Sequence, residues 1–281
     1  MRYRRPGLDI LAHSLLISGA LVFMLPVLLA VLASTQAPSA LFSGTLPLWW
    51  GNSGLDHYIT LLSEPVRGIG VPAWQLMLNS LFMALGIACG KLVIAILAAY
   101  ALVFFRFPLR RCCFWLIFIT LMLPIEVRII PTYGVVADLG LMDSYPGLVL
   151  PLIASATATF LFRQFFLTLP PELLEAARVD GAGPWRFFID IVLPLSRTNI
   201  AALFVIMFIY GWNQYLWPLV AMSSADHATL VMSLKRLTLS TDGTPPWHLA
   251  TAMTVLALLP PVMVIVLMQR WFIRGLVDTE K

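Results

Sequence analysis

Long apolar stretches separated by short charged segments form the dominant pattern along this chain. Asp, Glu, Lys and Arg are absent from five runs, at residues 10–55, 68–90, 144–162, 198–225 and 243–269. A helix needs about 20 residues to cross the hydrocarbon core of a bilayer, and most of these runs are long enough. The pattern therefore predicts six membrane-spanning helices, near residues 10–33, 79–104, 112–132, 145–167, 198–221 and 249–271.

The overall composition agrees with this pattern. Of 281 residues, 60% are hydrophobic and 11% are charged, and the mean hydropathy is +0.88. A soluble domain needs a far more charged surface, and disordered chains, disulfide frameworks and compact nucleic-acid binders have different compositions. We therefore expect an all-α, polytopic membrane protein, with one transmembrane domain over residues 1–281 and no nucleic-acid partner.

The basic residues orient the chain. With the N-terminus inside, thirteen fall on the inner side: Arg2, Arg4, Arg5, Arg106, Arg110, Arg111, Arg163, Arg178, Arg186, Arg197, Arg270, Arg274 and Lys281. Four fall on the outer side: Arg67, Arg128, Lys235 and Arg236. Together with Lys91, which interrupts the second predicted span, they account for all eighteen. Basic flanks resist translocation, so the imbalance predicts cytoplasmic termini and six spans.

The first apolar stretch, from about Leu8 to Ala33, has a second interpretation. It follows three arginines and ends in small residues, as a cleaved signal peptide does. It is longer than the usual apolar region of about 7 to 15 residues in such peptides, which favours an uncleaved first span.

Small and cyclic residues within the spans indicate how the helices pack. Gly86 and Gly90 form a GxxxG pair, which predicts close approach of another helix. Prolines at 124, 151, 218, 260 and 261 are expected to interrupt spans. Transport proteins tolerate such breaks where a neighbouring helix or cavity water satisfies the released carbonyl groups.

Groups for catalysis, metal binding or nucleotide binding are scarce. His13, His57, His227 and His248 fall in four segments without partners at helical spacing, so no metal site is expected. The stretch from Gly86 to Leu92 lacks the spacing and the Ser or Thr of a phosphate-binding loop. We therefore predict no catalytic residue, no metal and no cofactor in this chain, and no enzymatic activity of its own.

The predicted inner loop at residues 170–194 is the most informative segment. Pro171 and Pro184 suit the first turn of a helix, and Glu172 suits the positive end of the helix dipole. Gly181 and Gly183 allow the backbone to turn between them. The segment therefore predicts two short helices joined by an elbow.

The second of these helices is expected to be amphipathic. An apolar stripe with helical spacing is formed by Trp185, Phe188, Ile189 and Val192. From these residues alone, a hairpin that lies on the membrane surface and a hairpin that docks on a partner protein are equally good interpretations.

A spaced motif in this loop resembles a known family. Glu175-Ala176-Ala177, then three residues, Gly181, nine residues and Ile191-Val192-Leu193-Pro194 resembles the EAA signature of permease subunits of bacterial ABC importers. Residues 122–128, 141–151, 160–166 and 210–218 are similar to the carbohydrate-importer branch. With residues 106–110 and 274–278, they most resemble glycerol-3-phosphate importers. The first 75 residues match no motif.

The resemblance implies a type I ABC importer permease fold in the bacterial inner membrane. It implies a second permease chain, two ATP-binding subunits that hold ATP and magnesium, a periplasmic binding protein and surrounding lipid. Coupling to the ATPase would then use Glu175, Ala176, Ala177, Gly181, Ala182, Gly183, Ile191, Leu193 and Pro194. Glycerol-3-phosphate is the expected substrate, and a related phosphodiester or a neutral sugar stays open.

Few polar residues at membrane depth could meet a charged substrate. The candidates for a substrate pathway are Lys91, Arg128, Asn213 and Gln214. Each could instead serve helix packing, which is favoured because the partner permease could supply the substrate contacts. A secondary transporter would need a coupling-ion site or repeat symmetry, and an intramembrane enzyme would need paired catalytic groups. Neither is visible, so the importer subunit is favoured over both.

Overall fold

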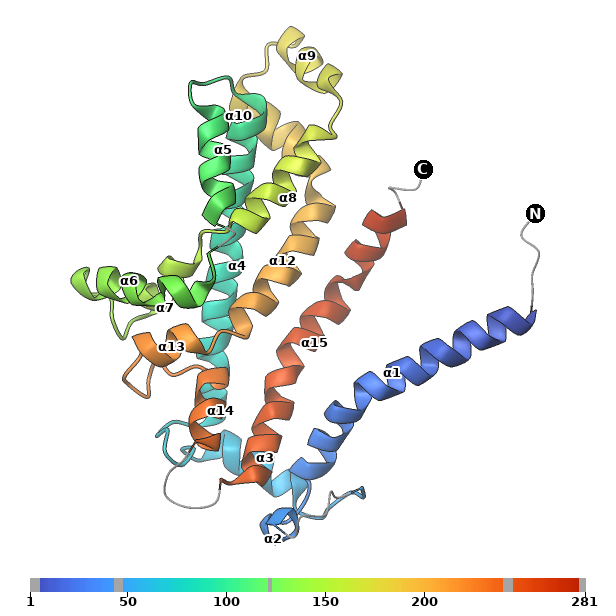
Figure 1. The fold of residues 1–281 in the computed structure, drawn as a ribbon, viewed down its shortest axis with the longest axis vertical. Helices are drawn as coiled ribbons and strands as arrows, with labels where there is room; N and C mark the ends of the chain where they lie inside the picture. Colours follow the sequence, from blue (N-terminus) through green and yellow to red (C-terminus); the bar gives the residue numbers. More distant parts are fainter. Residues whose placement is uncertain (1–5, 43–47, 121–122, 240–244, 278–281) are drawn as a thin grey trace. The chain divides into compact units, whose positions relative to one another are not determined.

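The computed structural model describes residues 6–42, 48–120, 123–239 and 245–277, and in these residues all regular structure is helical (Figure 1). The α-helices are α1 (Pro6–Ser34), α2 (Pro38–Phe42), α3 (Gly54–Ser63), α4 (Ala73–Phe104), α5 (Arg110–Ile119), α6 (Ile125–Asp138), α7 (Tyr145–Val149), α8 (Ala156–Leu167), α9 (Pro171–Val179), α10 (Pro184–Phe187), α11 (Leu193–Leu195), α12 (Arg197–Trp212), α13 (Leu216–Ala221), α14 (Leu230–Thr238) and α15 (Trp247–Val277). A 3₁₀ turn, η2 (Leu150–Leu152), and a π-helical turn, η3 (Phe188–Val192), complete the set. The all-α prediction is confirmed.

Three helices are long and apolar enough to cross a membrane, at Asp9–Ser34, Ala73–Phe104 and Trp247–Gln269. Two helix pairs qualify only jointly: Tyr145–Leu152 with Ala156–Leu167, bent by 47°, and Pro184–Leu195 with Arg197–Trp212, bent by 73°. The described residues thus contain three spans, or up to five if each bent pair counts as one. The predicted number of six is not confirmed.

The missing span is the one predicted at residues 112–132. In its place α5 ends at Ile119 and α6 begins at Ile125, with Pro124 in an extended conformation at φ −56° and ψ 147°. Proline has no N–H group and disfavours helical geometry in the residue before it. By contrast, α15 continues through Pro260 and Pro261, so the predicted interruption at these two prolines is wrong.

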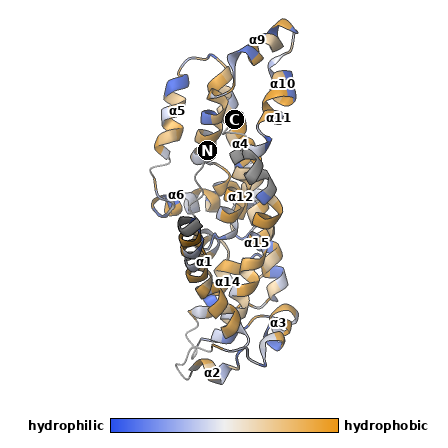
Figure 2. Cartoon of the chain, turned by 90° about the vertical axis from the view of Figure 1, so that its right-hand side faces the viewer, coloured by the Kyte–Doolittle hydropathy of each residue, from blue (hydrophilic) through white to orange (hydrophobic). Residues whose placement is uncertain are grey.

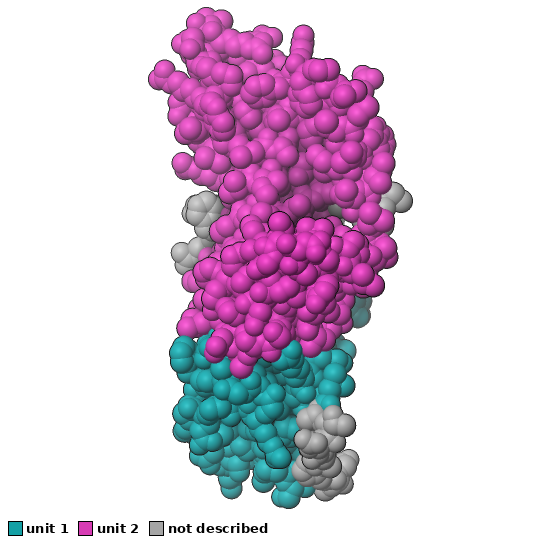
Figure 3. Space-filling view, turned by 90° about the vertical axis from the view of Figure 1, so that its left-hand side faces the viewer, with its two compact units in different colours: residues 1–75, 233–259 teal, residues 76–232, 260–281 magenta. Residues whose placement is uncertain are grey.

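The chain divides into two compact units, coloured separately in Figure 3. Unit 1 comprises Met1–Gln75 and Ser233–Leu259. Within it, the end of α1 contacts α3, where His57 Nδ1 lies 2.9 Å from the Ser34 carbonyl oxygen. The His57 ring also lies 4.8 Å, between centroids, from the ring of His248 at the start of α15. These contacts fix the C-terminal end of α1.

Most of the rest of α1 is exposed in the described chain. None of the residues in its most apolar 18-residue window is buried, and Leu15 and Phe23 are 75% and 83% exposed. Such a surface requires lipid or a further protein chain around it. Helix α1 thus agrees with the span predicted at residues 10–33.

Unit 2 comprises Leu76–Met232 and Pro260–Lys281, and α4 passes through its core. Its GxxxG pair faces Val149, at the end of α7, and Ile153, directly after η2. A Cβ atom at Gly90 would lie 2.6 Å from Ile153 Cγ2, and one at Gly86 would lie 3.0 Å from Val149 Cγ1. The predicted close approach is therefore confirmed, and the element that approaches α4 is the broken helix formed by α7 and η2.

Polar contacts join α4 to the segment before α14. Asn79 Nδ2 donates hydrogen bonds to the carbonyl oxygens of Asp226 and Ala228, at 2.7 and 2.9 Å. The Tyr145 hydroxyl donates to Asn79 Oδ1 at 2.7 Å. Each of these groups is thus paired within unit 2, as buried polar groups in a membrane protein require.

Asp143, in the turn before α7, anchors the same segment. Its carboxylate accepts hydrogen bonds from Ser224 N at 3.2 Å and from Ser224 Oγ at 2.8 Å. Partial burial by itself would raise the pKa of this carboxyl, but the hydrogen bonds from Ser224 and Ser223 outweigh it and lower the pKa. The ionised form is therefore the one that this turn holds.

The glycine contact gives a stability prediction. Gly90→Ala should destabilise the chain by about 1 to 3 kcal/mol, because the new methyl group overlaps the Ile153 side chain. The midpoint of thermal unfolding in detergent measures the effect, and adding Ile153→Ala should restore part of it. The matched control is Gly134→Ala in α6, where nothing lies within 4 Å of a new Cβ. An equal loss in both single variants would contradict the contact.

Candidate functional site

The predicted inner loop forms a hairpin of two helical arms, and its turn is closed by backbone hydrogen bonds. After α9, Gly181 has φ +72°, in the left-handed region. Gly181 N donates to Arg178 O at 3.1 Å, and Ala182 N donates to Ala177 O at 2.8 Å. This pair of bonds is the Schellman motif that ends a helix at glycine. The elbow expected at Gly181 is confirmed.

The sequence dictates this turn locally. No heavy atom lies within 4 Å of a Cβ built at Gly181, so glycine is required there by φ and not by crowding. Gly183 is extended, at φ −72° and ψ 168°, which is the conformation preferred before a proline. Pro184 then begins α10. The two glycines therefore have different roles although both are exposed.

The four residues of the expected apolar stripe are only partly covered within this chain. Trp185 and Ile189 are 66% and 55% exposed, whereas Phe187, Phe188 and Val192 are buried. A π-helical turn, which pairs residues five apart, occupies Phe188–Val192. Trp185 and Ile189 thus form an apolar pair that the described residues leave uncovered.

An aromatic cluster attaches the hairpin to the end of α4. The Tyr100 hydroxyl donates a hydrogen bond to the Pro184 carbonyl oxygen at 2.7 Å. The Tyr100 ring centroid lies 4.8 Å from that of Phe188, and the Phe104 centroid lies 5.3 Å from that of Phe187. Figure 1 shows α9 and α10 at the end of unit 2 where α4 ends. Rigid motion of the hairpin would therefore be transmitted to α4.

Sequence analysis missed Tyr100. The available indication was a Tyr and a Phe one helical turn apart, at residues 100 and 104, at the end of an apolar helix. That spacing is common, and it does not indicate which distant segment the two rings contact.

The predicted coupling residues differ in exposure. Ala177 is buried, and its carbonyl oxygen closes the turn. Ala182, Ile191, Leu193 and Pro194 are half-buried, while Glu175, Ala176, Gly181 and Gly183 are exposed. Glu175 lines a cavity of about 720 Å³ together with Arg106, Arg110 and Arg178. The hairpin thus combines a fixed inner side with an exposed side that is open to a partner.

Among the four candidate pathway residues, Lys91 is the most enclosed. It is 6% exposed, and its Nζ lies 3.4 Å from the centroid of the Tyr210 ring. A cation over an aromatic face is attracted by the ring quadrupole, and the attraction grows as water is excluded. Tyr210 on α12 thereby stabilises a charge on α4, inside unit 2.

The structure brings two of the other candidates together. Arg128 and Gln214 line the same small cavity, of about 60 Å³. Gln214 Nε2 donates to the Tyr210 carbonyl oxygen at 3.2 Å, which links this cavity to the residue beside Lys91. Asn213 does not line the cavity: it is exposed at the end of α12. Within the described residues, Glu126 forms no ion pair with Arg128.

Most of the chain matches a known protein family. Residues 91–278 match the model of the family described as "Binding-protein-dependent transport system inner membrane component". The chain belongs to this family. Its matched region includes the whole hairpin, Lys91, Arg128 and the break between α12 and α13. The predicted membership in the importer permeases is therefore confirmed, and this transport-system component is an inner membrane protein.

Full-length relatives have closely similar sequences. The chain is 53% identical over 279 residues to the sn-glycerol-3-phosphate transport system permease protein UgpE of Rhizobium meliloti (strain 1021). It is 54% identical over 278 residues to the protein of the same name from Agrobacterium fabrum (strain C58 / ATCC 33970). Each alignment covers 99% of both chains.

A solved structure shows the same fold. A chain in the crystal structure of a bacterial ABC transporter involved in the import of the acidic polysaccharide alginate matches with a TM-score of 0.80. The match covers 97% of this chain and 99% of that chain at 23% sequence identity. The predicted fold class, an ABC importer permease fold, is therefore confirmed at this level.

The anchor at Tyr100 gives the second prediction. Tyr100→Phe should loosen the hairpin by about 0.5 to 1.5 kcal/mol, because the Pro184 carbonyl loses its donor while the ring contacts remain. Hydrogen exchange of residues 171–195 in the assembled complex should become faster. The control is Tyr133→Phe, whose hydroxyl has no hydrogen bond in the described residues. Unchanged exchange in Tyr100→Phe would refute the anchoring role.

Proposed function

We propose that this chain is one of two permease subunits of a binding-protein-dependent ABC importer for sn-glycerol-3-phosphate. The observation that carries the proposal is full-length identity above 50% to permease proteins named for that substrate. The assembly would include a second permease chain, two ATP-binding subunits that hold ATP and magnesium, and a periplasmic binding protein. One solved relative, which transports alginate, is described in complex with a periplasmic protein, and that supports the last partner.

The hairpin is the element through which ATP hydrolysis would act on this chain. Its exposed side carries Glu175, Ala176, Gly181, Trp185 and Ile189, so an acidic group lies beside an uncovered apolar pair. A cleft in the ATP-binding subunit could cover this side. Its buried side is attached to α4 by Tyr100 and continues into α12 through the 73° bend. Closure of the ATP-binding subunits would then move α4 and α12 as rigid bodies.

The permease is proposed to cross the membrane six times with both termini in the cytoplasm. The three long helices and two bent pairs account for five spans, and α5 would begin the sixth. Support for the orientation comes from the unequal distribution of basic residues. Arg2, Arg4, Arg5 and Lys281, which contribute to it, lie outside the described residues.

The substrate pathway is proposed to pass the groups around Tyr210. A phosphate monoester that leaves water needs cations or N–H donors along its path. Lys91 and Arg128 are cationic, and Gln214 supplies an amide beside them. Asn213 would contribute only if the exposed end of α12 faces the pathway in the assembly.

Coupling can be tested at the glycine turn. Gly181→Val should be strained by roughly 1 to 3 kcal/mol at its positive φ and should tilt α9. We expect normal insertion and assembly but loss of transport-coupled ATP hydrolysis. Gly134→Val in α6, outside the hairpin, is the matched control, because no heavy atom lies within 4 Å of a new Cβ there. Equal ATPase activity in the two variants would contradict a coupling role of the turn.

Orientation can be tested with alkaline phosphatase, which is active only outside the cytoplasm. A fusion after Ser223 should be active, and a fusion after Lys281 should be inactive. The expected pattern follows from the thirteen inner and four outer basic residues. The reverse pattern would overturn the orientation but would leave the family unaffected.

Uptake of labelled sn-glycerol-3-phosphate by cells that produce the complete importer tests both substrate and pathway. Wild-type cells should take it up, and omission of the ATP-binding subunits should abolish uptake. Lys91→Met and Arg128→Gln should each reduce uptake at least about tenfold, since a desolvated anion loses a cation. Lys235→Met, at an exposed position, is the control. Uptake without ATP-binding subunits would favour a secondary transporter, and wild-type kinetics in both variants would exclude these residues from the pathway.

A further inference from the structure

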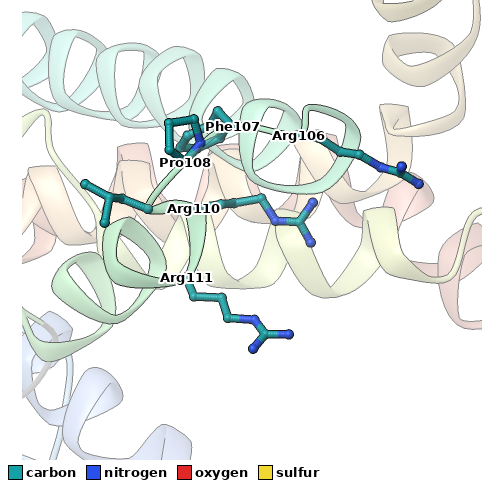
Figure 4. Close-up of a pocket in the computed structure, with 6 residues that line it drawn as sticks. Arg106, Phe107, Pro108, Arg110 and Arg111 are labelled. Carbon is teal, nitrogen blue, oxygen red and sulfur yellow. The ribbon is translucent and has the colours of Figure 1, made fainter.

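Three arginines line one cavity where α4 gives way to α5. Arg106 belongs to the connecting loop, and Arg110 and Arg111 begin α5. Figure 4 shows the three guanidinium groups leaving the backbone toward the same side of this loop. A fourth, Arg163 on α8, lies beside them, with its guanidinium carbon 4.2 Å from the centroid of the Phe114 ring. The four form what we call the arginine cluster.

No ion pair in the described residues neutralises the positive charge of the arginine cluster, although Glu175 shares the cavity of about 720 Å³ with Arg106 and Arg110. One cavity, of about 650 Å³, is lined by residues 106–111. A second, of about 340 Å³, is lined by Leu102, Arg110, Arg111, Phe114, Trp115 and Arg163. No Asp or Glu lines either cavity, and within the described residues none of the four arginines forms an ion pair at 4.0 Å or less. Like charges repel one another, so an anion bound beside these arginines would interact favourably with all of them.

Two of these charges occupy positions that the helix itself disfavours. Leu109, at φ 62°, is the N-cap residue of α5, and its side chain makes no capping hydrogen bond. Arg110 and Arg111 follow in the first turn of the helix. The N-terminal end of a helix dipole is positive, so cations in that turn are unfavourable. An anion at this position would interact favourably with both arginines and with the uncapped N–H groups.

The surroundings of the arginine cluster indicate which kind of anion fits. Leu109, Trp115 and Leu116 are 72%, 58% and 68% exposed, all on the loop and on α5. In Figure 2 the first turn of α5 has the hydrophilic colour and the following turns are hydrophobic. A tryptophan beside arginines at the end of a spanning helix is typical of the interface between lipid headgroups and acyl chains. A small soluble anion would leave these apolar side chains uncovered.

We propose that the arginine cluster binds the phosphate of an acidic phospholipid, whose acyl chain lies along Trp115 and Leu116. Guanidinium groups bind phosphate oxygens through paired hydrogen bonds, and the planar group of Arg163 is already oriented by Phe114. An acidic headgroup keeps a net negative charge, whereas a zwitterionic one offsets it. The site is independent of the substrate proposed above and rests only on this end of α4 lying at a membrane surface.

The test uses the complete importer in detergent, titrated with phosphatidylglycerol or phosphatidylcholine and observed by native mass spectrometry. We expect phosphatidylglycerol to bind more tightly than phosphatidylcholine. In Arg110→Gln/Arg111→Gln, the dissociation constant for phosphatidylglycerol should rise at least about tenfold. The matched control is Arg186→Gln/Arg197→Gln, which removes two exposed basic groups outside the arginine cluster. The control should bind phosphatidylglycerol as the wild type does.

Other outcomes would overturn the proposal. If phosphatidylglycerol affinity fell equally in both double variants, the attraction would be non-specific. If Arg110→Gln/Arg111→Gln lost as much affinity for phosphatidylcholine as for phosphatidylglycerol, recognition of headgroup charge would be excluded. Displacement of phosphatidylglycerol by millimolar inorganic phosphate would indicate a site for free phosphate. Loss of the ATP-binding subunits from Arg110→Gln/Arg111→Gln, with unchanged lipid affinity, would assign the arginine cluster to a protein interface.

Discussion

The hydrogen-bonding requirement of a peptide in lipid determines the role of α4. A segment that crosses a membrane must satisfy its own N–H and C=O groups, which α4 does over 32 residues. Residues along α4 then provide a close helix contact, a charge and an anchor for the hairpin. Gly86 and Gly90 admit the broken helix, Lys91 carries a charge, and Tyr100 holds the hairpin. Each feature depends on the continuity of this one helix.

Unit 2 stabilises its enclosed cation and its cations beyond the end of α4 in different ways. Lys91, which is 6% exposed, is stabilised by the ring of Tyr210. Arg106, Arg110 and Arg111, beyond the end of α4, lack protein partners of opposite charge in the described chain. An enclosed cation requires a partner from the protein, whereas one at an interface can obtain it from lipid or water.

The hairpin combines local rigidity with an uncovered outer side. The Schellman bonds at Gly181 fix the angle between its arms, and the aromatic cluster fixes the second arm to α4. Trp185 and Ile189, on the second arm, are exposed. An element that transmits motion must hold its shape on one side and offer a contact on the other, and these residues meet both requirements.

The sequence by itself determined the features that depend on neighbouring residues. The apolar runs of α1, α4 and α15, the elbow at Gly181 and the start of α10 at Pro184 follow from hydropathy, positive φ and proline geometry. Only the tertiary structure decided contacts between distant segments. Tyr100 and Pro184 are 84 residues apart, and the π-helical turn at Phe188–Val192 departs from the usual helical spacing. Lys91 and Tyr210 likewise meet only because α4 and α12 pack together, and no local preference of either residue specifies its partner.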